Sequence, residues 1–175
     1  SEKERAEEVF RESKKNIDDV KRKLERVLED SKRTLDELRK EVEKVLKESE
    51  DELRKLARSE GEEVKRIVDD LRRLSEKSFE EVRELLERIE RVSRKIARDL
   101  EEILKDAKRK TDELRKEGMT EELIREIREL NKRLNDTIED VIRRMKDLNR
   151  RLAEVIKEII ERNKKLIEDA ARRIK

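Results

Sequence analysis

Small polar side chains recur at regular intervals among the apolar residues of this chain, and they are its candidates for chemistry. A serine hydroxyl acts as a nucleophile only beside a general base. The sequence has no histidine and no cysteine, and its many carboxylates fall on the outer faces of the expected helices. The serines are therefore predicted to form buried hydrogen bonds and not to catalyse a reaction.

The composition excludes several other kinds of site. Lys+Arg number 51 and Asp+Glu 49, so the net charge is +2, and the charged fraction is 57%. Without cysteine or histidine we expect no disulfide framework and no Cys/His metal site, and without a glycine-rich phosphate loop no cofactor. No basic stripe with interleaved aromatics predicts nucleic-acid binding, and no run of about 20 apolar residues predicts a membrane span.

The spacing of the apolar residues predicts helices and argues against disorder. Apolar residues return at steps of three and four along almost the whole chain, as amphipathic helices require. The pattern itself repeats every 18 residues, for example at Val9, Val27 and Val45. Eighteen residues make five turns of an ideal helix, so the apolar stripe stays straight, whereas a seven-residue repeat would impose a supercoil.

Two glycines divide the chain into three segments of similar length. Gly118 suits the left-handed position that ends a helix, and Thr120 is a good N-cap for the helix that follows. The sequence therefore predicts an all-α fold, an antiparallel up-down-up three-helix bundle in a single domain. Its nearly straight helices are expected over about 2–59, 62–117 and 120–174.

The junction at Gly61 leaves two arrangements open. Gly61 suits the C′ position of the first helix, and Ser59 with Glu62 has the spacing of a capping box. Yet the apolar phase continues across Gly61, so one helix running through it, paired in a domain-swapped homodimer, is the alternative. We favour the hairpin and a monomer that needs no partner, because the straight helix would bring Glu60 against its twofold mate.

Antiparallel helices with this repeat place the polar residues in three layers. Each step of 18 along the first helix is matched by a step of 18 back along the second and forward along the third. The predicted layers are Ser13, Thr111 and Asn131; Ser31, Ser93 and Asn149; and Ser49, Ser75, Ser78 and Asn163. Beside the stripe lie further partners or plain boundary residues, namely Asn16, Thr34, Asn135 and Thr137. Because a slipped helix would bury unpaired polar groups, the layers are predicted to fix the register of the helices.

With its 18-residue repeats, its Ser/Thr/Asn layers and its Gly118-Met119-Thr120 loop, the chain resembles de novo designed, parametric helical bundles with built-in hydrogen-bond networks. The resemblance implies a very stable, soluble structural scaffold, which is not an enzyme and has no natural compartment beyond the cytoplasm of an expression host. A component of a designed oligomer or switch is the alternative reading. A natural spectrin-like module is a further alternative, but such modules usually carry core tryptophan and heptads.

Overall fold

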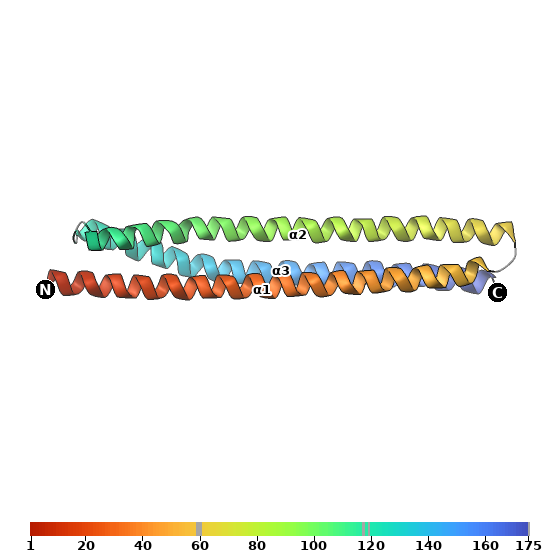
Figure 1. The fold of residues 1–175 in the computed structure, drawn as a ribbon, viewed down its shortest axis with the longest axis horizontal. Coiled ribbons are helices and arrows are strands. Elements are labelled where there is room, and N and C mark those ends of the chain that lie inside the picture. Colours follow the sequence, from red (N-terminus) through yellow and green to blue (C-terminus); the bar gives the residue numbers. More distant parts are fainter. Residues whose placement is uncertain (59–60, 117, 119, 175) are drawn as a thin grey trace. The chain divides into compact units, whose positions relative to one another are not determined.

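The computed structural model describes residues 1–58, 61–116, 118 and 120–174. It contains three long helices, which Figure 1 traces in chain order: α1 (Glu2–Ala57), α2 (Glu62–Lys116) and α3 (Glu121–Ile174). Consecutive helices run in opposite directions, and all three pack against one another. The predicted fold class, an all-α antiparallel three-helix bundle, is confirmed.

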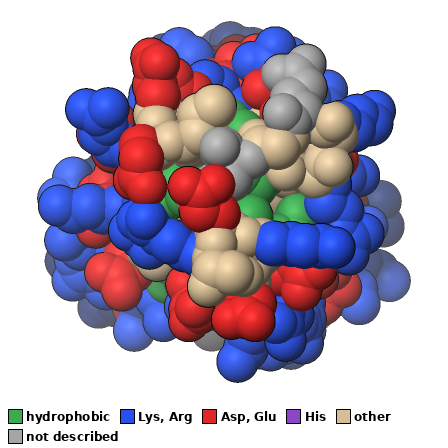
Figure 2. Space-filling view, turned by 90° about the vertical axis from the view of Figure 1, so that its left-hand side faces the viewer, with side chains coloured by type: hydrophobic (Ala, Val, Ile, Leu, Met, Phe, Trp, Pro, Cys, Tyr) green, Lys and Arg blue, Asp and Glu red, His purple; other side chains and the backbone are tan. Residues whose placement is uncertain are grey.

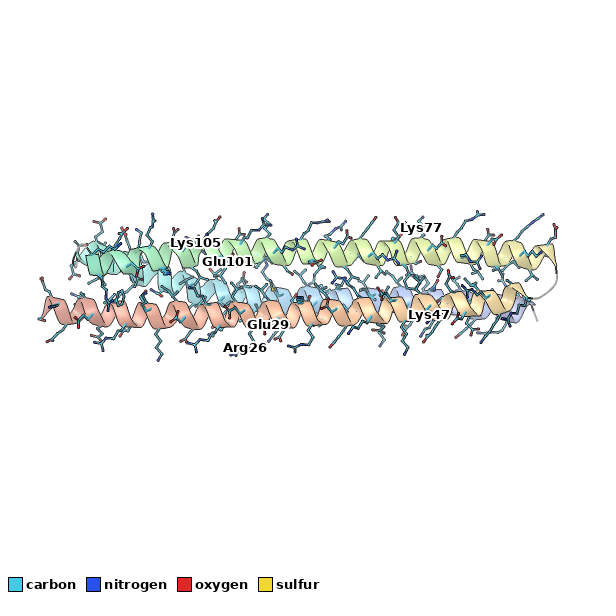
Figure 3. The ribbon with its side chains drawn as sticks, viewed as in Figure 1. Arg26, Glu29, Lys47, Lys77, Glu101 and Lys105 are labelled. Atoms are coloured by element: carbon cyan, nitrogen blue, oxygen red, sulfur yellow. The ribbon has the colours of Figure 1, made fainter. Side chains whose placement is uncertain are left out.

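Local sequence favours each helix at both ends. The first turn of every helix contains two glutamates, and the last turn contains two basic residues. This placement opposes the helix dipole, whose positive end lies at the N-terminus. Between the ends, charged side chains such as Arg26 and Lys77 point away from the other helices (Figure 3). Each helix thus turns one apolar stripe inward and leaves its charged faces to water.

By its internal contacts the chain forms two compact units, and each contains a stretch of all three helices. Unit 1 comprises Ser1–Ser31 and Arg91–Asp147, and unit 2 comprises Lys32–Glu90 and Leu148–Lys175. Figure 2 looks onto unit 1 from the end that carries the N-terminus and shows apolar side chains enclosed by charged ones. The sequence expectation of one domain over residues 1–175 stays a prediction.

The cores of the two units use the residues of the apolar stripes. In unit 1, Phe10 packs in a cluster with buried side chains from α1, α2 and α3, namely Val9, Leu114, Ile124 and Ile127. In unit 2, Phe79 belongs to a larger cluster that also draws on every helix. Phe10, Phe79 and Met145 are all buried. Burial of each such side chain contributes about 1.5–3 kcal/mol relative to leaving it in water.

The connection before α3 follows ordinary capping geometry. Gly118 has a φ of 86°, in the left-handed region that glycine adopts without strain. The hydroxyl of Thr120 accepts a hydrogen bond from the backbone N–H of Leu123 at 3.1 Å, which is an N-cap contact. Glu117 and Met119 lie outside the described residues.

The junction before α2 differs from the prediction. The expectation that Gly61 occupies the C′ position of the first helix is wrong, because α1 ends at Ala57. Gly61 instead precedes α2 directly, and its carbonyl accepts a hydrogen bond from the N–H of Lys65 at 3.3 Å. Its φ of 135° is incompatible with an α-helix, so the helix does not run through this position. The capping role predicted for Ser59 and the exposure predicted for Glu60 fall outside the described residues.

Candidate functional site

The first polar layer lies in unit 1 and connects all three helices. The hydroxyl oxygens of Ser13 on α1 and Thr111 on α2 are 2.7 Å apart. The side-chain amide of Asn131 on α3 donates to the Ser13 hydroxyl at 2.8 Å. Asn16, one turn after Ser13, donates from its own amide to the side-chain oxygen of Asn131 at 2.9 Å. These four side chains are called the Ser13 network below.

The direction of every proton in the Ser13 network follows from its ends. Thr111 bonds the carbonyl oxygen of Ala107 at 2.6 Å, and a carbonyl can only accept, so Thr111 is the donor there. The Ser13 proton must therefore point at Thr111. At the other end, the amide nitrogen of Asn131 also bonds the carbonyl oxygen of Ile127 at 2.8 Å, which uses its second hydrogen. The network thus runs one way, from Asn16 through Asn131 and Ser13 to Thr111.

Helix geometry explains why these residue types suit these positions. Ala107 and Ile127 each precede their polar partner by four residues, so each side chain bonds the carbonyl that lies one turn back. Threonine is β-branched and stiff at χ1, which holds its hydroxyl between that carbonyl and α1. Ser13 and Thr111 are 3% and 0% exposed, so both hydroxyls depend entirely on these partners.

Ion pairs and amides close the three interhelical sides of the first layer. On the side between α1 and α2, Lys14 pairs with Asp112 at 3.5 Å. On the side between α2 and α3, Lys110 pairs with Glu126. The side between α1 and α3 carries the amides of the Ser13 network, beside a shallow hollow of about 350 Å³. The ion pairs are partly exposed and contribute at most about 1 kcal/mol each, so they mainly cover the network.

The second predicted layer does not repeat this network. Ser31 and Ser93 lie in unit 1 and are buried, whereas Asn149 lies in unit 2 and is half-buried. The Ser31 hydroxyl and the side-chain oxygen of Asn149 are both shielded from water and have no hydrogen-bond partner. At the positions that correspond to Thr111 and Asn16, this layer has Ser93 and Thr34. It therefore lacks both the stiff threonine hydroxyl and the long amide that complete the first layer.

The third layer, in unit 2, is partly connected. Asn163 donates its amide to the Ser49 hydroxyl at 3.1 Å, and both side chains are buried. The Ser75 hydroxyl is equally buried but has no partner, and Ser78 is half-buried. Asn163 comes one turn before the position that an 18-residue step from Asn149 would reach. Its amide therefore reaches α1 from a different direction than the amide of Asn131 does.

Asn16 is the member that sequence reasoning left undecided between partner and boundary residue. It follows Ser13 by three residues, so the two side chains share one side of α1, and this spacing was the available signal. Of the other flanking residues, Thr34 and Thr137 are half-buried and Asn135 is exposed. The polar residues thus form one complete network, one partial contact and several isolated hydroxyls.

The chemistry of the Ser13 network is limited to hydrogen bonding. The groups that accept its protons are a hydroxyl, an amide oxygen and backbone carbonyls. None of these is basic enough to take a proton from serine and generate a nucleophile. What the arrangement does is hold α1, α2 and α3 at one relative height and rotation.

Comparison of the chain with protein-family models, with curated proteins and with solved structures finds no match. Within the described residues, no helix is long and apolar enough to cross a membrane. Over the same part of the chain, His, Cys, Asp and Glu form no group of three or more that could hold a metal ion.

Proposed function

We propose that this chain is a designed structural scaffold, a helical bundle of parametric type whose buried polar residues set the register of its helices. It has no natural biochemical activity and is not an enzyme. The observation that carries the proposal is the Ser13 network, in which every proton is directed and all three helices take part. The strict 18-residue spacing of apolar and polar positions supports the same reading.

The energetic reason is the asymmetry between a made and an unmade buried hydrogen bond. A made bond contributes only about 0.5–1.5 kcal/mol net, whereas a buried polar group left without a partner costs about 1–3 kcal/mol. Sliding α3 by one turn would separate Asn131 from Ser13 and leave both Ser13 and Asn16 without this partner. Apolar contacts alone would tolerate such a slip much better, because the stripe repeats itself along the helix.

The scaffold needs no partner and no cofactor to fold. Both connections join neighbouring antiparallel helices, so each chain supplies all three sides of its own core. We expect a dilute solution to contain single folded chains. This part of the proposal concerns folding alone and leaves open what folded chains do when they are concentrated.

The test removes the polar groups of the first layer and asks whether the structure stays unique. In a triple variant, Ser13→Val, Thr111→Val and Asn131→Leu, we expect a free energy of unfolding equal to or above the parent's. We also expect extra backbone amide signals in NMR spectra, from chains with slipped helices. The matched control is Asn135→Leu, which makes the same amide-to-leucine change at an exposed position. A single set of sharp signals from the triple variant would sink the proposal.

A further inference from the structure

The large apolar side chains that remain exposed all lie in unit 2. Among the described residues they are Leu74 on α2, with 49% of its surface exposed, and Val155 and Leu166 on α3, with 41% and 40%. Single exposed apolar residues are common on protein surfaces and need no explanation. Three of them within one unit, on two helices that pack together, call for a closer look at where they point.

Leu74 lies on the side of α2 that faces α3. Glu90, which pairs with Arg39 of α1 at 2.9 Å, marks the opposite side of α2. On an ideal helix Leu74 and Glu90 are about 160° apart, with the buried Ser75 and Val82 between them. Since the buried stripe of α2 points between α1 and α3, the side of Leu74 is the side of α3.

Leu166 and Val155 lie on the side of α3 that faces α2. Asn131, whose amide reaches Ser13 of α1, marks the other side of α3. On an ideal helix Leu166 is about 100° from Asn131, with the buried Asn163 between them, and Val155 is only about 20° from Leu166. The exposed residues of both helices therefore border the same groove.

The core contacts place these residues at matching heights. In unit 2, Val82 and Leu86 of α2 share one cluster with Ile156 and Leu152 of α3, which fixes which positions of the antiparallel helices lie opposite each other. The same register puts three apolar pairs along the groove. These are Ile67 with Ile174, Leu74 with Leu166, and Leu85 with Val155, and their members are half-buried or exposed. The six residues are called the α2/α3 strip.

We infer that the α2/α3 strip is a contact surface for a second copy of this chain. Charge selects this partner. Between Glu62 and Glu90, α2 carries ten acidic and seven basic residues, a net charge of −3. Between Leu148 and Ile174, α3 carries eight basic and five acidic residues, a net charge of +3. A second copy offers the same two charges, so its α2 is complementary to α3, and its α3 to α2.

This complementarity fixes the symmetry of the pair. A twofold axis parallel to the helices places each α2 antiparallel to the α3 of the other copy and keeps every residue at its own height. Leu74 and Leu166 of one copy then form a layer of four leucines with Leu166 and Leu74 of the other. A twofold axis across the helices would instead set α2 against α2, where both helices carry −3.

The available area suits a weak dimer. The stretch of α2 in the strip is about 43 Å long, and two helices of about 10 Å diameter make a face of roughly 860 Å². Stable interfaces bury about 800 Å² per partner, and the apolar pairs cover only part of this face. The small net charge of the chain, +2, opposes association only slightly. Association is therefore expected in concentrated solution and not in dilute solution.

Sedimentation equilibrium over a wide concentration range tests the pairing. The average mass should rise from the 21.2 kDa of one chain toward twice that value. Leu74→Glu and Leu166→Glu should each weaken the dimer about tenfold or more. Arg98→Gln is the control, since it changes the net charge as Leu74→Glu does but lies at an exposed position of unit 1. Because these positions are exposed, all variants should keep the parent's helix content, which circular dichroism checks.

Two further measurements test the symmetry. Added salt should weaken a dimer that sets α2 against α3, and it would strengthen one that sets α2 against α2. The chain has no cysteine, so Leu74→Cys and Leu166→Cys chains can be oxidised separately and mixed. Disulfide-linked pairs should form mainly in the mixture.

A mass that stays at one chain at every concentration would overturn the inference. So would a dimer that both glutamate variants leave unchanged, or one that salt strengthens. Binding of a synthetic amphipathic helix without any self-association would also overturn it, by showing that the strip takes a different partner. None of these results would touch the proposed scaffold function, whose test concerns the register within a single chain.

Discussion

The hydroxyl of Ser13 on α1 lies 2.7 Å from that of Thr111 on α2, and both groups are buried. Thr111 gives its own proton to the carbonyl oxygen of Ala107, so its oxygen is free to accept from Ser13. A hydroxyl that donates and accepts at once polarises its neighbours and strengthens both bonds. This contact therefore couples the height of α1 to that of α2 more specifically than the surrounding apolar contacts do.

Thr111→Val should lower the free energy of unfolding by about 1–3 kcal/mol, because it leaves the Ser13 proton without its acceptor. Valine has the shape of threonine, so packing changes little. The Ser13 hydroxyl can turn toward a carbonyl of its own helix, which places the cost near the lower end of this range. Guanidinium denaturation measures it, with Thr137→Val on α3 as the matched control. A Thr111→Val variant as stable as the parent would contradict a structural role for this bond.

The sequence allowed most of the fold to be predicted, because the apolar period and the glycines act locally. The predicted helix ends differ from those of α1, α2 and α3 by no more than two residues. The positions of the polar layers also follow from the repeat. Which hydroxyls bond could not be predicted, since this depends on rotamers and on reach. Thr111 and Ser93 occupy equivalent positions, yet the Ser13 hydroxyl opposite Thr111 has a partner and the Ser31 hydroxyl opposite Ser93 has none.

The place of Gly61 was mispredicted for a related reason. Its type suited either the end of one helix or the approach to the next, and the apolar phase was compatible with both. Tertiary packing decides where α1 stops, and it stops at Ala57, earlier than the glycine. Similarly, Asn163 stands off the 18-residue repeat, and only the packed helices show that its amide reaches Ser49.

Replacing either turn glycine by alanine should destabilise the protein through the backbone alone. Gly61 and Gly118 have φ values of 135° and 86°, which alanine adopts only with strain. An added Cβ at either glycine would meet nothing within 4 Å, so no clash contributes. Each change should therefore lower the free energy of unfolding by about 1–2 kcal/mol.

Gly118→Asn serves as the control for this pair, because asparagine tolerates the left-handed region better than alanine does. Its cost should be clearly smaller than that of Gly118→Ala in the same denaturation experiment. Equal costs for asparagine and alanine would mean that the turn relaxes and that the observed φ is not required.

Thermal unfolding should occur well above the range of ordinary domains. Helix propensity, apolar pattern and terminal charges all favour the same structure, and such agreement is the mark of a stable design. Mesophilic domains melt at about 45–65 °C, and we expect the midpoint of this chain to exceed that range. Circular dichroism at 222 nm measures it. A midpoint inside the ordinary range would count against a designed origin.

The sharpest contrast lies between two asparagines that occupy equivalent positions on α3, 18 residues apart. Asn131 gives both amide hydrogens to partners and accepts from Asn16, so Asn131→Leu should cost about 1–3 kcal/mol. The side-chain oxygen of Asn149 is shielded from water and has no partner, so Asn149→Leu should leave stability unchanged or raise it. Both changes place leucine at a half-buried position of one helix, so each is the control for the other. Equal effects in urea denaturation would mean that the Ser13 network contributes no more than the isolated polar groups of the second layer.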